Sequence, residues 1–80
     1  MPKYRYQHGN DEIVVKTPLL GGSSELYING EMTDRSFGLF EDRLHGKLKS
    51  GEEIKAICSV GFFTPKVTLF VDGKLSHPLK

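Results

Sequence analysis

One short pattern occurs twice in this chain of 80 residues and constrains its fold more than any other feature. Residues 26–32 read Leu-Tyr-Ile-Asn-Gly-Glu-Met, and residues 69–75 read Leu-Phe-Val-Asp-Gly-Lys-Leu. An Asn-Gly or Asp-Gly pair between apolar residues is the strongest short-range signal of a β-hairpin, because a two-residue turn of the primed type needs positive φ at both central residues. We therefore predict a strand, a tight turn and a second strand at both places.

A two-residue turn also sets which residues face each other across each hairpin, because side chains alternate between the two faces of a strand. The aromatic residue then shares a face with an aliphatic residue that follows the turn. The expected pairs are Ile28 with Glu31, Tyr27 with Met32 and Leu26 with Thr33 in the first hairpin, and Phe70 with Leu75 in the second. Strands that are apolar on both faces are typical of a small barrel or sandwich.

Further strand patterns surround the two hairpins. Residues 12–17 are rich in β-branched side chains and precede a proline, which cannot donate a ladder hydrogen bond. Tyr4 and Tyr6 alternate with polar residues, and residues 53–58 alternate as well. We predict a single all-β domain over residues 1–80. Its expected form is a small antiparallel barrel or sandwich of about six to seven strands, built from two similar meanders.

Residues 33–49 fit two different structures. Apolar residues at helical spacing favour a helix, whereas two glycines would each destabilise that helix by about 1 kcal/mol relative to alanine. The alternative is a strand over residues 43–49 that pairs with residues 53–58 through a loop at residues 50–52. This register matches apolar residues across the pair: Leu48 with Ile54, Gly46 with Ala56 and Leu44 with Cys58. We favour the strand, and a short helical turn over residues 36–41 stays open as the alternative.

Composition limits the classes of partner. Lys and Arg number 11 against 10 Asp and Glu, a net charge of +1, so a local patch would be needed to attract nucleic acid or an anionic membrane. No run of 18 apolar residues is present, and we expect no membrane contact. A single cysteine, Cys58, allows no disulfide within the chain, and the N-terminal residues lack the apolar core of a signal peptide. These features predict a cytoplasmic domain.

Catalytic and metal-binding patterns are weak. The three histidines, His8, His45 and His77, stand 37 and 32 residues apart, far from the short ligand spacings of zinc sites. Adjacent carboxylate pairs lie at predicted turns or strand ends, and neighbours along a strand point to opposite faces, so they do not form an acid–base dyad. We therefore predict a protein that is not an enzyme and has neither a metal site nor a cofactor.

The most distinctive polar segment is a basic row within residues 43–49. On a strand, its alternate side chains share one face. Small β-barrels bind single-stranded nucleic acid by combining cations with aromatic platforms, but alternating lysines are also how an ordinary strand meets solvent. Exposed aromatic residues are a second candidate contact. The candidate interaction residues are Arg43, His45, Lys47 and Lys49, with Lys55 beside Lys47, and the aromatics Tyr4, Tyr6 and one of Phe62 and Phe63.

Three functions are compatible with these patterns. The leading hypothesis is a non-catalytic domain that acts through contact with an unknown protein partner or through self-association as a homodimer. The first alternative is a nucleic-acid-binding β-barrel that uses the basic strand face. The second is a small-molecule binder between the apolar loops at residues 18–24 and 60–65, which the internal similarity of the two halves would place near each other.

The two hairpin units also carry a family resemblance. The segments Leu-Tyr-Ile-Asn-Gly-Glu at residues 26–31 and Leu-Phe-Val-Asp-Gly-Lys at residues 69–74 resemble the repeated hairpins of the Fas apoptotic inhibitory molecule family. The overall pattern is also similar to small all-β proteins of bacteria. Resemblance to the named family implies an all-β fold and a non-enzymatic, intracellular role through protein contacts, and it assigns no functional residue.

Overall fold

The computed structural model describes residues 3–17, 23–37, 41–60 and 65–77. Within these residues the chain is all-β and holds eight strands. They are β1 (Lys3–His8), β2 (Asp11–Lys16), β3 (Ser24–Ile28), β4 (Glu31–Ser36), β5 (Glu41–Lys47), β6 (Glu53–Val60), β7 (Pro65–Val71) and β8 (Lys74–Ser76). We find no helix in the described part of the chain that is long and apolar enough to cross a membrane.

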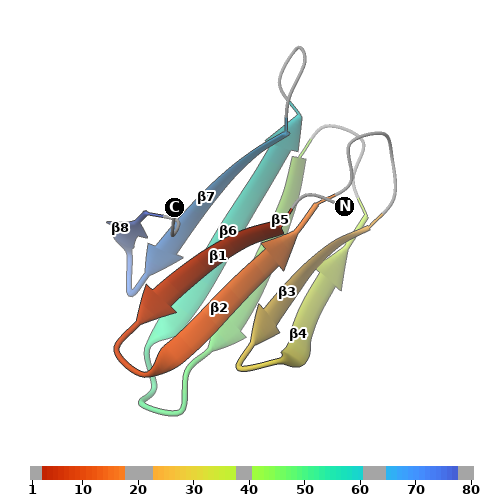
Figure 1. Ribbon diagram of the computed structural model, residues 1–80. Helices are drawn as coiled ribbons and strands as arrows, with labels where there is room; N and C mark the ends of the chain where they lie inside the picture. The colour runs from red at the N-terminus through yellow and green to blue at the C-terminus, as the bar shows by residue number, and fades with distance from the viewer. Residues whose placement is uncertain (1–2, 18–22, 38–40, 61–64, 78–80) are drawn as a thin grey trace.

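The strands form two antiparallel meanders in sequence order, β1-β2-β3-β4 and β5-β6-β7-β8. The two sheets stack on each other, with the tight turns gathered at one end of the molecule (Figure 1). The predicted all-β fold of two similar meanders is therefore confirmed. The described strands exceed the predicted six to seven because residues 3–8 pair with β2 along their whole length, so each meander has four strands.

The core lies between the sheets and follows from strand alternation. Every second side chain of the inner strands points inward, and the two inner faces merge into one apolar cluster. Burial of each large aliphatic side chain contributes roughly 1.5–3 kcal/mol. The buried apolar residues are Tyr6, Ile13, Val15 and Leu26 from the first sheet and Leu44, Leu48, Ile54, Ala56, Cys58, Leu69 and Val71 from the second half of the chain.

Both predicted hairpin turns have the expected geometry. Asn29 and Asp72 adopt φ values of 51° and 49°, and each is followed by a glycine with positive φ. The Asn29 side-chain oxygen accepts a 2.9 Å hydrogen bond from the Glu12 backbone N–H, and the Asn29 backbone N–H donates to the Glu12 carbonyl at 2.8 Å. Asp72 makes the same two contacts with Glu53 in the second half, both at 2.8 Å. Each turn residue therefore ties its hairpin to the preceding strand.

Register across the hairpins agrees with the prediction near the turns and departs from it further away. Tyr27 faces Met32 and Phe70 faces Leu75, as expected. Leu26, however, faces Asp34 and not Thr33, because a β-bulge shifts the register between Leu26 and Tyr27. The predicted Leu26–Thr33 pair is thus wrong.

Residues 41–47 form a strand, which confirms the favoured structure for the basic segment, but its register was predicted wrongly. Gly46 faces Ile54 and Leu44 faces Ala56, two residues away from the expected pairing. The connection spans residues 48–52, with Leu48 turned into the core and its N–H donating to the Glu52 carbonyl at 2.9 Å. A shift of two residues keeps every side chain on its expected face. Of the proposed helical turn, Ser36 and Glu41 belong to strands, and residues 38–40 lie outside the described residues.

A close approach of β5 to β3 and β4 closes one side of the sandwich. A methyl group built on Gly46 would lie 3.0 Å from Ile28 Cδ1 and Thr33 Cγ2 and 3.2 Å from Leu26 Cδ2. The Asp34 carboxylate of β4 accepts a 2.8 Å hydrogen bond from the His45 backbone N–H of β5. Side-chain contacts of this kind, and not a continuous strand ladder, join the two sheets, so the fold is a sandwich.

Candidate binding surfaces

The side chains that alternate with the core form two outer faces, one on each sheet. Cross-strand register arranges them in rows, and the two halves of the chain place equivalent rows on the two faces. The row on the first sheet is Arg5, Val14, Tyr27 and Met32, and the row on the second sheet is His45, Lys55, Phe70 and Leu75. Each row combines a cation, an aromatic ring and an aliphatic residue on the last strand.

The outer face of the second sheet, called here the β5–β8 face, collects most of the predicted basic row. Arg43, His45 and Lys47 are exposed and point outward from β5. Lys55 lies opposite His45, and not beside Lys47 as predicted, because of the register shift. Lys49 follows the strand in the turn at residues 48–52 and is exposed there.

An aromatic residue that was not among the predicted interaction residues joins this face. Phe70 lies directly opposite Lys55 on β7, and Leu75 beyond it is 57% exposed. Ile57, opposite Arg43, adds a half-buried aliphatic side chain. The sequence pattern missed Phe70 because hairpin geometry and core filling already explained its segment. Only the pairing of β6 with β7 shows that it stands beside a cation.

Of the two aromatic contacts predicted in β1, Tyr6 is buried and Tyr4 is only partly exposed. Tyr6 is 1% exposed and belongs to the core, so it is not available to a partner. Burial raises the pKa of Tyr6 to about 12, and the nearby Cys58 adds to the shift. Tyr4 is half-buried and packs against the same cluster. Phe62 and Phe63, and most of the two apolar loops proposed to hold a small molecule, lie outside the described residues.

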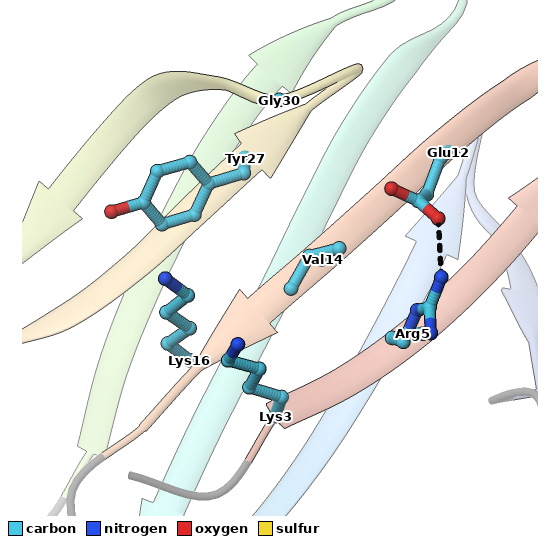
Figure 2. Close-up of a pocket in the computed structure, with 7 residues that line it drawn as sticks. All are labelled: Lys3, Arg5, Glu12, Val14, Lys16, Tyr27 and Gly30. Carbon is cyan, nitrogen blue, oxygen red and sulfur yellow. Dashed lines mark hydrogen bonds and ion pairs between the residues drawn. The ribbon is translucent and has the colours of Figure 1, made fainter.

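The outer face of the first sheet carries a groove of about 330 Å³ (Figure 2). Val14 and Tyr27 supply its apolar surface, and Lys3 and Lys16 extend into it from β1 and β2. Lys16 Nζ lies 4.5 Å from the centre of the Tyr27 ring, a cation–π contact. On the far side of the groove, Arg5 and Glu12 form an ion pair of 2.8 Å. We refer to this site as the β1–β3 groove.

The charges of this nearly neutral chain are segregated in space. Among the described residues, the first outer face carries four cations, Lys3, Arg5, Lys16 and Arg35, against the carboxylates of Glu12 and Glu25. The second carries Arg43, Lys47, Lys55 and Lys66 against Glu41 and Glu53. Other carboxylates gather at the tight turns, among them Asp11, Glu31, Glu52 and Asp72. Both outer faces are therefore cationic, although the net charge of the whole chain is only +1.

A buried polar cluster lies between the sheets at the end opposite the tight turns. Ser24 Oγ lies 2.8 Å from Asp42 Oδ2 and 3.2 Å from Thr17 Oγ1, and all three residues are buried. Burial raises the pKa of the Cys58 thiol, against a smaller lowering by a hydrogen bond with Ser24. This thiol is only 3% exposed, as is typical of a structural cysteine and not of a reactive one. The cluster therefore stabilises the contact between the two sheets.

Neither a search for metal ligands among the described residues nor comparison with known proteins identifies a further site. In the part of the chain that the structure describes, no group of three or more His, Cys, Asp or Glu side chains could hold a metal ion. Comparison of the chain with protein-family models, with curated proteins and with solved structures gave no match.

Proposed function

We propose that this chain is a non-catalytic binding domain that engages a partner protein through the β5–β8 face. The observation that carries the proposal is the row His45, Lys55, Phe70 and Leu75, which crosses all strands of the second sheet. The exposed Leu75 and the half-buried Phe70 stand beside cations, and aromatic and aliphatic anchors with a polar rim are typical of protein interfaces. The single buried cysteine supports a reducing, cytoplasmic setting for this role.

Charge on this face favours an acidic partner over a second copy of the chain. Among the described residues, Arg43 forms an ion pair with Glu41 at 2.9 Å, whereas Lys47, Lys55 and Lys66 have no such partner. A two-fold contact of this face with itself would bring the same cations together, and opposed like charges weaken association. Carboxylates on a different protein would pair with them instead.

The internal similarity of the chain provides a matched test. Leu75 and Met32 hold equivalent positions on the two outer faces and are 57% and 51% exposed. A photo-crosslinking amino acid placed at position 75 in host cells should capture a discrete protein. The same group at position 32 should not capture that protein. Lys55→Glu should abolish the capture, and Arg35→Glu on the other face should leave it unchanged. Equal capture from positions 75 and 32 would count decisively against this interface.

A second candidate function uses the same face. Phe70 stands beside Lys55 with Arg43, His45 and Lys47 nearby, and single-stranded nucleic acids bind such combinations of stacking ring and cations. This candidate predicts binding of oligothymidylate or oligouridylate whose log affinity falls linearly with log salt. Lys47→Glu together with Lys49→Glu should remove that binding. A salt-independent or absent interaction eliminates this candidate and leaves the protein interface unaffected.

A further inference from the structure

We infer that the β1–β3 groove is a second binding site, for a small organic anion that carries a carboxylate or phosphate group on a compact apolar body. The site lies on the outer face of the first sheet, away from the β5–β8 face. It is therefore independent of the protein interface proposed above, and either can fail without the other.

Two lysines facing each other carry the inference. Lys3 on β1 and Lys16 on β2 are directly paired in the antiparallel register, and both extend into the same groove (Figure 2). Like charges directly opposite each other across a sheet are destabilising. Departures from local rules of this kind are expected at functional or strained sites. An anion placed between the two ammonium groups would turn the repulsion into two charge-assisted contacts.

The two carboxylates nearest these lysines, Glu12 and Glu25, make their hydrogen bonds with other side chains. Glu12 pairs with Arg5 at 2.8 Å. Glu25, the register neighbour of Lys16, accepts a 3.0 Å hydrogen bond from the Tyr27 hydroxyl, and this bond raises the pKa of Tyr27. Within the described residues, Lys3 has no ion pair, and the partner recorded for Lys16 is the face of the Tyr27 ring. Although Glu25 lies opposite Lys16, neither lysine forms an ion pair with any residue that the structure describes.

The rest of the groove selects for size and polarity. Val14, which lies on β2 between Glu12 and Lys16, forms an apolar floor, and the Tyr27 ring forms one wall. A volume of about 330 Å³ is at the lower end of the range of ligand sites, so it suits a compact molecule and not an extended polymer. An anionic group at the lysines with a small ring or branched chain over Val14 would match this arrangement.

The test uses four probes of graded chemistry: phenyl phosphate, benzoate, inorganic phosphate and benzyl alcohol. In two-dimensional NMR titrations, phenyl phosphate and benzoate should shift the amide signals of Val14, Lys16 and Tyr27 in a saturable manner. Inorganic phosphate should bind more weakly, and benzyl alcohol should cause no saturable shift. The relative affinities of phenyl phosphate and benzoate decide between a phosphate and a carboxylate as the preferred group.

Charge removal tests the role of the lysines. Lys3→Met and Lys16→Met should each weaken binding of the better probe by about tenfold, because each removes one charge-assisted contact. Lys66→Met, on the other sheet, should have no effect. Lys3→Met also removes a like-charge repulsion, so its melting temperature should not fall, and lost binding cannot be attributed to unfolding. Unchanged affinity in both groove variants, equal binding of benzyl alcohol, or no saturable shift with any anion would overturn the inference.

Discussion

Ser24 Oγ of β3 lies 2.8 Å from Asp42 Oδ2 of β5, and this hydrogen bond links the two sheets of the sandwich. Both residues are buried, at 0% and 7% exposure. Asp42 Oδ1 has no hydrogen-bond partner within the described part of the chain. The Ser24 hydroxyl is therefore the principal contact that compensates the burial of this carboxylate, since a buried charge without a partner is strongly unfavourable.

Ser24→Ala should destabilise the fold by about 1–3 kcal/mol, because it leaves Asp42 buried without its hydrogen-bond donor. Urea denaturation followed by circular dichroism measures the loss. Ser50→Ala, at an exposed turn, serves as the matched control and should change the free energy of unfolding by less than about 0.5 kcal/mol. Equal effects of the two substitutions would show that the link between Ser24 and Asp42 does not stabilise the sandwich.

Gly46→Val should lower stability by about 1–3 kcal/mol, because β5 approaches β3 and β4 too closely to admit a branched side chain. A Cβ at this position would already stand 3.0 Å from Thr33 Cγ2. Thr33→Ser removes that methyl group and should recover part of the loss in the double variant. Thermal unfolding of the single and double variants measures this coupling, and strictly additive effects would contradict the proposed contact.

Substitutions at Asp72 separate its backbone geometry from its side-chain hydrogen bond. Asp72→Asn should be nearly neutral, because Asn29 makes the same contact in the first half. Asp72→Gly keeps the positive φ but loses the 2.8 Å bond from the Glu53 N–H. Asp72→Ala loses that bond and also forces alanine into the left-handed region, at a cost of about 1–3 kcal/mol. Denaturant midpoints should fall in the order Asn, Gly, Ala, and any order in which Ala is the most stable rejects this account.

Tyr6→Phe should stabilise the protein by about 1 kcal/mol near neutral pH, because the Tyr6 hydroxyl is buried without a hydrogen-bond partner among the described residues. Burial raises the pKa of Tyr6 from 10.0 to about 12. The unfolded chain thus releases this proton at lower pH than the folded chain, and stability falls as pH rises through that window. Tyr6→Phe should flatten the fall. Parallel pH profiles of the two proteins, measured by urea denaturation, would refute this role for Tyr6.

The sequence predicts those features that depend on neighbouring residues. Asn29 and Asp72 each precede a glycine within an alternating apolar pattern, and turn chemistry alone accounts for their positive φ and for the Tyr27–Met32 pair next to the turn. The Leu26 pairing was predicted wrongly because the register shifts between Leu26 and Tyr27, beyond the residues whose pairing the turn fixes. The β5–β6 register differs from the predicted one by two residues, and a shift by an even number leaves each side chain on the same face of the sheet. The faces were therefore predicted correctly, although the cross-strand pairs were not.

By itself, then, the sequence determined the all-β class, the two hairpins and the division of each strand into an inner and an outer face, because turns and alternation are local properties. Only the tertiary structure decided that Tyr6 is buried, that Phe70 stands beside Lys55 and that Lys3 opposes Lys16. These relationships join residues on different strands, and their geometry depends on register and on how two sheets share one small core. The candidate binding surfaces belong to this second group.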